Sequence, residues 1–371
     1  RYSSQEYGLN ASLTFPRVLF PLPASLKKHL SMLNPRTRFN VGYTLIQRPE
    51  FNRGGVQGSV HIQWNNLNNE LFNVGITDLT ILHSKITPAY DSIINVIDEG
   101  RGTYRRVFNN SIVSNINFTY TKASTNYGAN NQINKFFRFY AELAGFSSAL
   151  FKETLLNNQG RIYGLSYYKY FKLSSDYRIG LPLSRNNQIA SRIHIGIIRP
   201  YGGINEGLPY EKFFFSGGSN SNRAWRPRRI GAGSYTPPRL ENGEIDYSFE
   251  QPGELILESS LEWRTKLFSF FNWAFFIDAS NVWMLPNSPD PLNREGSTFE
   301  TTDFWKELAI GAGFGLRLDF TFLILRFDVG IKMYDPAQPL PQRFVGKELW
   351  YHPPFGKRGQ SQLNIGIGYP F

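Results

Sequence analysis

The residues best suited to binding chemistry lie in one segment near the middle of the chain. Residues 202–253 form the longest stretch without alternating polarity, and the central part, 216–233, is rich in glycine and arginine. Glycine permits tight turns, and a guanidinium presents several hydrogen-bond donors in a planar fork that suits carboxylates. Loops longer than about 12–15 residues without regular structure are commonly functional or disordered. This composition therefore predicts a folded loop that holds cationic side chains in defined places.

Two acidic residues further along the chain are suitable partners for such an arginine. Glu262 and Asp278 lie in two successive segments of alternating polarity, and the alternation places both on the polar face. An arginine from a loop folded over that face could pair with both carboxylates. Alternatively, the two carboxylates belong to a ladder of charges on that face with Arg264, Arg317 and Arg326. Either arrangement stabilises a conformation and performs no bond chemistry.

Patterns typical of catalysis or metal binding are missing from the sequence. There is no cysteine, the five histidines lack metal-ligand spacing, and no Gly-x-Ser-x-Gly motif occurs. The glycine run at 311–315 lies inside an alternating segment and lacks the helix and later acidic residue of a nucleotide-binding loop. If the chain folds as a barrel, carboxylates that face its lumen would allow an enzyme such as a lipase or protease, but no partnered nucleophile is visible in the sequence. We therefore expect no enzyme activity, no cofactor and no metal.

Alternation with a period of two residues dominates the chain and predicts strands. In residues 254–266, for example, all charged residues occupy even positions and most apolar ones occupy odd positions. Most such segments run to roughly 10–14 residues, whereas soluble strands average about 5–6 and a tilted strand needs about 9–11 to cross a bilayer. Charges and glycines recur on the polar face, which suits a wide polar lumen. The sequence therefore predicts an all-β fold, a transmembrane antiparallel β-barrel over residues 1–371, with residues 202–253 folded into or over the lumen.

Thirteen segments follow this pattern. They are 7–16, 37–48, 55–66, 70–82, 109–122, 134–146, 161–180, 188–200, 254–266, 270–283, 308–320, 322–334 and 362–371. Bacterial barrels of one chain have even strand numbers, so we expect sixteen in the intact protein, with some strands before residue 1. The chain also begins at Arg1 without the signal peptide that an exported protein needs. We therefore expect an N-terminal part to precede it.

The overall composition agrees with a barrel and argues against other classes. Aromatic residues make up 16% of the chain, which is too many for a disordered protein. No stretch approaches the roughly 18 apolar residues of a transmembrane helix. The net charge of +11 would ordinarily suggest nucleic acid. However, most basic residues are scattered through short polar segments, a distribution that suits phosphorylated lipid headgroups. We expect membrane lipid as a partner and no nucleic acid.

The central loop resembles the long-loop signature of the BamA/TamA family of outer-membrane assembly barrels. The core of that signature is a glycine pair, a short spacer, and then Arg-Gly-aromatic. Gly217 and Gly218 match the pair, Arg223 matches the arginine and Trp225 the aromatic residue, whereas Ala224 replaces the usual glycine. The extended form looks most like that of TamL, the lipoprotein relatives of TamA in Bacteroidota. It adds Arg226, Arg228 and Gly231.

Further family-like motifs follow in the same order. Residues 260–262 resemble the Ser-Leu-Glu of the strand after the loop, and residues 275–283 resemble an aromatic-x-Asp-x-Gly strand, with Ser280 in place of glycine. The chain ends in an aromatic-rich strand, as do the barrels that this machinery recognises. One face of this strand is expected to carry Leu363, Ile365, Ile367, Tyr369 and Phe371. We expect the opposite face, with Asn364, Gly366 and Gly368, to pack little and to leave the seam with the first strand easy to open.

The resemblance implies both a site and a function. Arg223 would pair with Glu262 and Asp278 and fasten the loop inside the barrel. POTRA domains would precede the barrel, and the protein would insert other barrels into the outer membrane of a Gram-negative bacterium by strand templating at a lateral seam. Its clients would be unfolded outer-membrane proteins, its surroundings membrane lipid and lipopolysaccharide, and periplasmic or lipoprotein subunits could accompany it. The alternative function is a two-partner-secretion transporter or a passive pore.

Overall fold

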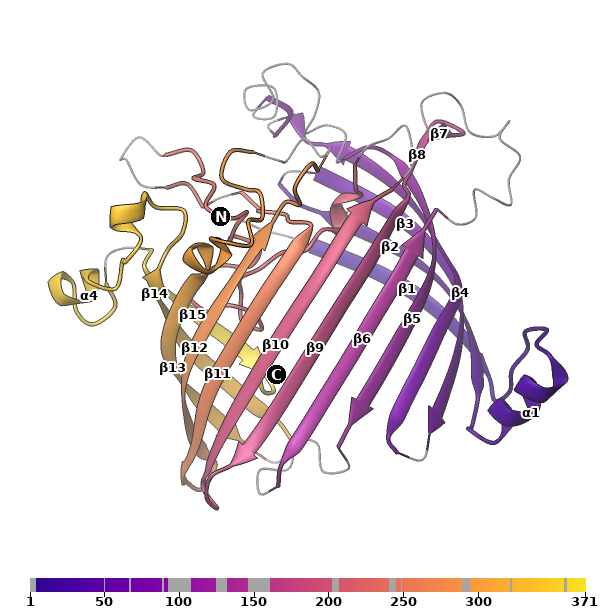
Figure 1. The fold of residues 1–371 in the computed structure, drawn as a ribbon, viewed down its shortest axis with the longest axis horizontal. Helices are drawn as coiled ribbons and strands as arrows, with labels where there is room; N and C mark the ends of the chain where they lie inside the picture. Colours follow the sequence, from indigo (N-terminus) through magenta and orange to yellow (C-terminus); the bar gives the residue numbers. More distant parts are fainter. Residues whose placement is uncertain are drawn as a thin grey trace.

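The chain folds as an antiparallel β-sheet that curves into the wall of a barrel (Figure 1). The computed structural model describes residues 5–49, 51–66, 68–88, 90–92, 108–124, 132–145, 161–201, 207–239, 245–247, 249–288, 294–320, 322–356 and 359–371. The strands are β1 (Gln5–Phe15), β2 (Arg36–Gln47), β3 (Phe51–Asn66), β4 (Glu70–Ile86), β5 (Ser111–Ala123), β6 (Asn134–Ala144), β7 (Arg161–Ile162), β8 (Leu165–Tyr167), β9 (Tyr170–Pro182), β10 (Asn187–Pro200), β11 (Leu255–Phe268), β12 (Phe271–Trp283), β13 (Ala309–Asp319), β14 (Ile324–Tyr334) and β15 (Ser361–Ile367).

Thirteen of these strands form the wall, in the order β1-β2-β3-β4-β5-β6-β9-β10-β11-β12-β13-β14-β15. Each pairs antiparallel with its neighbours along this path, as in β1 with β2 and β14 with β15. The thirteen alternating segments of the sequence correspond to these thirteen strands, so the predicted fold class is confirmed. Within the described residues, no ladder joins β1 to β15. The sixteen strands expected for a longer chain stay a prediction.

One predicted strand is wrong at its beginning. Residues 161–180 do not form a single strand, because a tight turn at Tyr163 and Gly164, both with positive φ, separates β7 from β8. β8 then runs parallel to the start of β5, and the wall strand β9 begins only at Tyr170. Alternation of polarity does not reveal such a turn, because the residues on both sides of it alternate in the same way.

Alternation places apolar side chains outside the wall and polar ones inside. On β11, Leu261 and Trp263 are half exposed, whereas Glu258 and Glu262 are buried. On β12, Ile277 is exposed and its neighbour Asp278 is 1% exposed. Charged side chains are therefore buried on the lumen side, as the sequence predicted for a polar lumen.

The helices are short and lie between strands. Those whose bounds lie within the described residues are α1 (Ala24–Ser31), α4 (Glu348–Tyr351) and the 3₁₀ turns η3 (Tyr210–Lys212), η4 (Phe304–Glu307) and η5 (Leu340–Gln342). No helix in the described ranges has the length and hydropathy needed to cross a membrane. Since β1 and β10 stand seven positions apart on an antiparallel wall, they run in opposite directions. The segment after β1, with α1, therefore lies at the barrel end opposite to that where the long loop leaves β10 (Figure 1).

Candidate functional site

The central loop is folded by its glycines into a narrow hairpin at residues 216–230, whose two ends form an isolated antiparallel bridge. The backbone N–H of Gly218 donates to the carbonyl oxygens of Asn222 and Trp225, each at 3.1 Å. Gly217 and Gly218 have φ of +102° and +103°, a region that other residues rarely adopt. The glycine pair therefore makes the turn that places the hairpin tip against the inner wall of the barrel.

Arg223 at this tip is buried between two carboxylates. Its Nε and Nη2 donate to the two oxygens of Asp278 at 2.8 and 2.9 Å, and its backbone N–H donates to the same carboxylate at 3.0 Å. Its Nη1 donates to Glu262, and its guanidinium lies 3.4 Å from the ring centroid of Phe276. Burial disfavours the charged guanidinium, but Asp278 and Glu262 outweigh it and raise the pKa of Arg223 above its ordinary value.

The same carboxylates belong to a larger charge network on the inner face. Glu262 accepts hydrogen bonds from Arg264 at 2.9 Å and from Arg317 at 3.2 Å. Asp328 pairs with Arg317 at 2.6 Å and with Arg326 at 3.2 Å. The two arrangements that the sequence left open, pairing with a loop arginine and a ladder along the wall, are therefore both present.

Two asparagines join the tip to the wall, and neither was predicted to contact the loop. Asn222 donates from Nδ2 to the carbonyl oxygen of Ala309 at 2.9 Å. Asn364 on β15 donates from Nδ2 to the carbonyl oxygen of Arg223 at 2.8 Å, in a buried position. Asn364 is a polar lumen-facing residue directly opposite Asp328 in the register. That placement is the only signal in the sequence that could have pointed to it.

The other residues of the loop motif lie apart from the carboxylate pair. Trp225 is buried, and the Nζ of Lys332 lies 5.2 Å from its ring centroid. Arg226 is exposed. Arg228 donates to Glu250 within the loop at 3.3 Å. Of the arginines in the motif, only Arg223 lies between Glu262 and Asp278.

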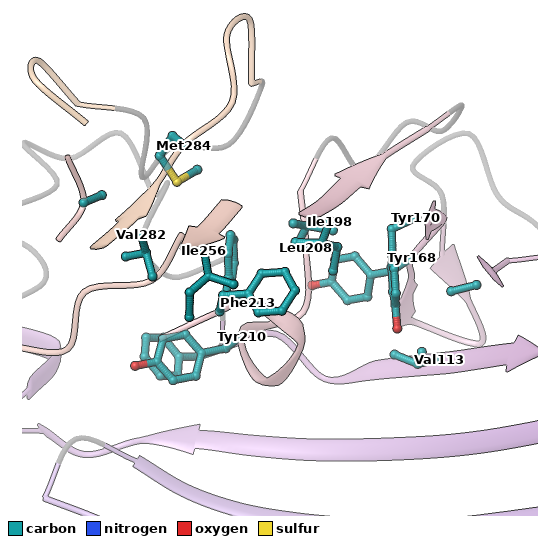
Figure 2. Packing of buried hydrophobic residues seen from close by; sticks show 14 of the residues in the cluster. Val113, Tyr168, Tyr170, Ile198, Leu208, Tyr210, Phe213, Ile256, Val282 and Met284 are labelled. Carbon is teal, nitrogen blue, oxygen red and sulfur yellow. The ribbon is translucent and has the colours of Figure 1, made fainter. Parts of the chain in front are cut away.

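The first described part of the loop crosses the barrel through an apolar cluster (Figure 2). The cluster combines loop residues with residues of several strands, namely Leu208, Tyr210, Phe213 and Phe214 of the loop, Phe51 of β3, Val113 of β5, Ile198 of β10 and Ile256 of β11. Leu208 is 2% exposed and Ile198 is fully buried. The loop therefore packs on the inner side of the wall at this level and shares an apolar cluster with strands far apart along the wall.

Ion pairs hold this part of the loop to strands on the N-terminal side of the wall. Lys212 donates to Glu142 Oε1 on β6 at 2.6 Å, and the hydroxyl of Tyr170 donates to the same oxygen at 2.7 Å. Arg48, beyond the end of β2, donates to Glu250 at 2.8 Å. The loop is thus attached at two places, by Arg223 to β11 and β12 and by these pairs to strands nearer the N-terminus.

The predicted C-terminal strand is wrong beyond residue 367. Leu363, Ile365 and Ile367 face outward and are 58–76% exposed, as expected, but β15 ends there. Gly368 has φ +79°, which turns the chain inward. The rings of Tyr369 and Phe371 then lie 4.3 and 5.3 Å from the guanidinium of Arg264, which also donates to the carbonyl oxygen of Phe371 at 3.2 Å. These two aromatic residues contact the lumen network, not the outer face.

The expectation that the inner face of the last strand packs little is also wrong. Asn364 is 8% exposed because it is bonded to the loop tip. A side chain at Gly366 would come within 2.7 Å of the guanidinium of Arg326, so this glycine gives the arginine its space. Gly368 alone has open space around it. Two of the three residues on this face, Asn364 and Gly366, therefore pack against the loop tip and the charge network.

This arrangement of paired charges can hold chain segments in position. Every carboxylate named above is paired with a guanidinium or an ammonium group. Among the described residues, no group of three or more histidine or acidic side chains could hold a metal ion. The described part of the chain is therefore a β-barrel wall with a loop pinned to its inner face by a buried arginine.

Comparison with known proteins identifies the family. The whole chain, residues 1–371, matches the Omp85 superfamily domain, and the protein belongs to this superfamily. Among solved structures, BamA from Haemophilus ducreyi lacking POTRA domains 1-3 is similar with a TM-score of 0.58 and 15% identity, over 98% of this chain and 61% of that chain. CdiB from Acinetobacter baumannii gives a TM-score of 0.48 and 12% identity, over 90% of this chain and 48% of that one.

The likeness to these structures concerns the fold, since identity is low. This chain spans 61% of the BamA chain that it matches. No curated protein sequence matches it.

Proposed function

We propose that this protein inserts other β-barrel proteins into the outer membrane of a Gram-negative bacterium, at a seam between its last and first strands. The main support is the weak attachment of β15. It pairs with β14 at seven positions, whereas β11 and β12 pair at thirteen. In the described part of the chain, no ladder uses the other edge of β15. Such a junction is easy to open, and unpaired N–H and C=O groups at a strand edge accept an added strand.

In this proposal the clients are unfolded outer-membrane proteins. The C-terminal strand of a client pairs with the free edge of the first strand while β15 separates from it. The outer face of β15 is consistent with a seam at this strand. Leu363, Ile365 and Ile367 are exposed there, where lipid or an entering strand would contact them. Membrane lipid and lipopolysaccharide surround the barrel, and a periplasmic or lipoprotein subunit would deliver clients. We also propose that the protein is TamL-like and carries POTRA domains.

The loop has a positioning role in this proposal. Asn364 attaches the last strand to the loop tip, Gly366 leaves space for the guanidinium of Arg326, and the tip is held by Arg223. The loop therefore supports β15 from the lumen side while its outer edge stays free. This role requires binding and no catalysis, so we propose that the protein is not an enzyme.

A disulfide across the seam tests the insertion mechanism. The chain contains no cysteine, so Ile365→Cys can be combined with single cysteines along the first strand of the full-length protein. Insertion is measured as folding of an unfolded test barrel into liposomes that contain the protein, followed by gel mobility without heating. We expect insertion to stop when the seam disulfide forms and to return on reduction.

A matched control uses strands that are already paired. Leu261→Cys with Ile277→Cys links opposite, outward-facing residues of β11 and β12. This disulfide should leave insertion unchanged. Undiminished insertion with the seam disulfide formed would rule out opening at this seam.

A transporter or pore is the second candidate function, and the loop on the inner side of the wall favours it. A loop held at two walls would close a conducting path until it moved. In planar bilayers, a transporter should conduct more when residues 207–253 are deleted and should not accelerate folding of the test barrel. An insertase, in contrast, should accelerate folding of the test barrel.

A further inference from the structure

The connection between β1 and β2, residues 16–35, lies on the outer face of the barrel. Thr37 shares the outward face of β2 with Val41, which is 63% exposed, yet Thr37 itself is 1% exposed. The connection covers it: Thr37 donates to the carbonyl oxygen of Arg17 at 2.7 Å and accepts from the backbone N–H of Leu19 at 3.1 Å. Figure 1 shows α1 beside the wall, outside the barrel.

Apolar contacts fix the connection to the wall. Val18 and Leu30 are 4% and 7% exposed and pack against Ile62 of β3, with Trp64 at the edge of this cluster. Ile62 lies opposite Thr37 in the register and so shares its outward face. The backbone N–H of Asn65 also donates to the carbonyl oxygen of Leu33 at 3.0 Å. The connection is therefore a built part of the outer surface.

The free side of the connection carries large apolar side chains. Leu19, Phe20 and Leu26 are 38%, 42% and 45% exposed, and Met32 is 69% exposed. They continue the exposed apolar belt of the neighbouring strands, which faces the acyl chains in a membrane barrel. Exposure of several apolar residues on one short segment is unfavourable in water and favourable at a lipid boundary.

The charges of the same segment are all of one sign. Residues 16–35 contain Arg17, Lys27 and Lys28 and no acidic residue. All three basic residues are exposed, and within the described residues none of them forms an ion pair. Basic residues beside apolar ones are typical of segments that lie in the interface of an anionic membrane.

We propose that residues 16–35 form a membrane-interface anchor that binds anionic phospholipid headgroups at the barrel end opposite to the long loop. The exposed apolar side chains enter the acyl boundary next to the belt, and the three basic residues lie at the level of the phosphates. The helix α1 runs along the interface beside β2 and β3. The anchor holds that end of β1–β3 at a fixed depth in the membrane.

A single fluorescent label tests the depth of the segment. Because the chain has no cysteine, Met32→Cys can carry one environment-sensitive fluorophore in the full-length protein reconstituted in vesicles. The matched control is Tyr163→Cys, an 88% exposed site at the tip of the β7–β8 turn. We expect lipids brominated on their acyl chains to quench the label at residue 32 and to leave the label at residue 163 unquenched. Equal quenching at both sites would overturn the proposal.

Charge reversal tests the lipid class. With the label at residue 32, quenching by brominated phosphatidylglycerol should exceed quenching by brominated phosphatidylcholine about threefold, because each basic residue near an anionic surface contributes attraction. Lys27→Glu with Lys28→Glu should bring this ratio close to one.

The control Lys306→Glu with Lys347→Glu, at the other end of the barrel, should leave this ratio unchanged. A ratio near one before charge reversal, or an unchanged ratio after it, would exclude headgroup binding. Gel mobility without heating verifies that each variant is folded.

Discussion

The two attachments of the loop differ in burial and in the number of bonds. At the attachment to β11 and β12, Arg223 is 1% exposed, and its partners Glu262 and Asp278 are at most 1% exposed. At the attachment on the N-terminal side, Lys212 is 25% exposed and Arg48 is 15% exposed, and Arg53 of β3 pairs with Glu211 of the loop, which is 32% exposed. One end of the loop is therefore fixed by a dry, multidentate contact and the other by contacts that water partly reaches.

This difference indicates which part of the loop moves first. Removing one member of a buried ion pair leaves an uncompensated charge and costs about 3–5 kcal/mol, whereas exposed pairs contribute about 0–1 kcal/mol. The tip at Arg223 should stay attached to the wall that carries the last strand. The segment near Lys212 should detach more readily, and a client or substrate could open the lumen from that side.

The largest effect is expected from Arg223→Ala. The substitution removes four hydrogen bonds to buried carboxylates, if its backbone bond to Asp278 is lost with the tip. We expect the free energy of unfolding to fall by about 3–5 kcal/mol and residues 216–230 to become accessible to protease. Urea titration followed by gel mobility measures the first and limited proteolysis the second.

Arg226→Ala is the matched control for this change. Arg226 belongs to the same motif but is exposed, and surface substitutions usually change stability by about 0.5 kcal/mol or less. A similar loss of stability in both variants would contradict the assignment of Arg223 as the anchor.

The next largest effect is expected from Lys212→Ala, which tests the looser attachment. Glu142 would keep its bond from Tyr170 but lose its cation. We expect a loss of about 1.5–3 kcal/mol, the range of hydrogen bonds to charged groups. Hydrogen exchange should increase at residues 207–215 and stay unchanged at 219–224. Faster exchange at both segments would mean that the two attachments act as one unit.

The sequence predicted the wall better than the places where the chain leaves it. Alternation located all thirteen wall strands because each side chain meets either lipid or the lumen. Alternation failed at Gly164 and Gly368, where a left-handed backbone redirects the chain without changing the polarity pattern. The pairing of Arg223 with Glu262 was accessible because the polar face was known and the loop motif supplied the arginine.

The contacts of the last strand were not accessible in the same way. Asn364 bonds a backbone carbonyl, and a carbonyl carries no residue type that a sequence could reveal. At Ala224, which replaces the usual glycine of the family signature, the structure shows a close contact that the sequence did not reveal. Its methyl group lies beside Gly311, where an added side chain would collide with it at 2.6 Å.

A smaller effect is expected from Asn364→Ala, which removes the hydrogen bond between β15 and the loop tip at Arg223. The variant loses one buried hydrogen bond, which contributes about 1 kcal/mol. We expect faster hydrogen exchange along residues 361–367, with β11 and β12 unchanged. Gln362→Ala is the control, because the side chain of Gln362 donates to the carbonyl oxygen of Leu363 in its own strand and makes no bond to the described part of the loop. If both variants exchange alike, the bond from Asn364 to the loop does not hold the last strand.

The smallest effect is expected from Tyr369→Ala, at the inward-turned end of the chain. The ring of Tyr369 stacks on Arg264, a contact that contributes about 0.5–1 kcal/mol where it is partly exposed. Arg264 keeps its bond to Glu262, so the firm attachment of the loop should survive and residues 368–371 should become mobile. A cysteine label at Ser361, on β15, should then report no change in stability, while a label at residue 371 should show faster motion.

Tyr369→Phe is the control, because it retains the ring and should keep the end of the chain in place. If Tyr369→Phe releases the end as Tyr369→Ala does, the hydroxyl group holds it and the contact with Arg264 does not.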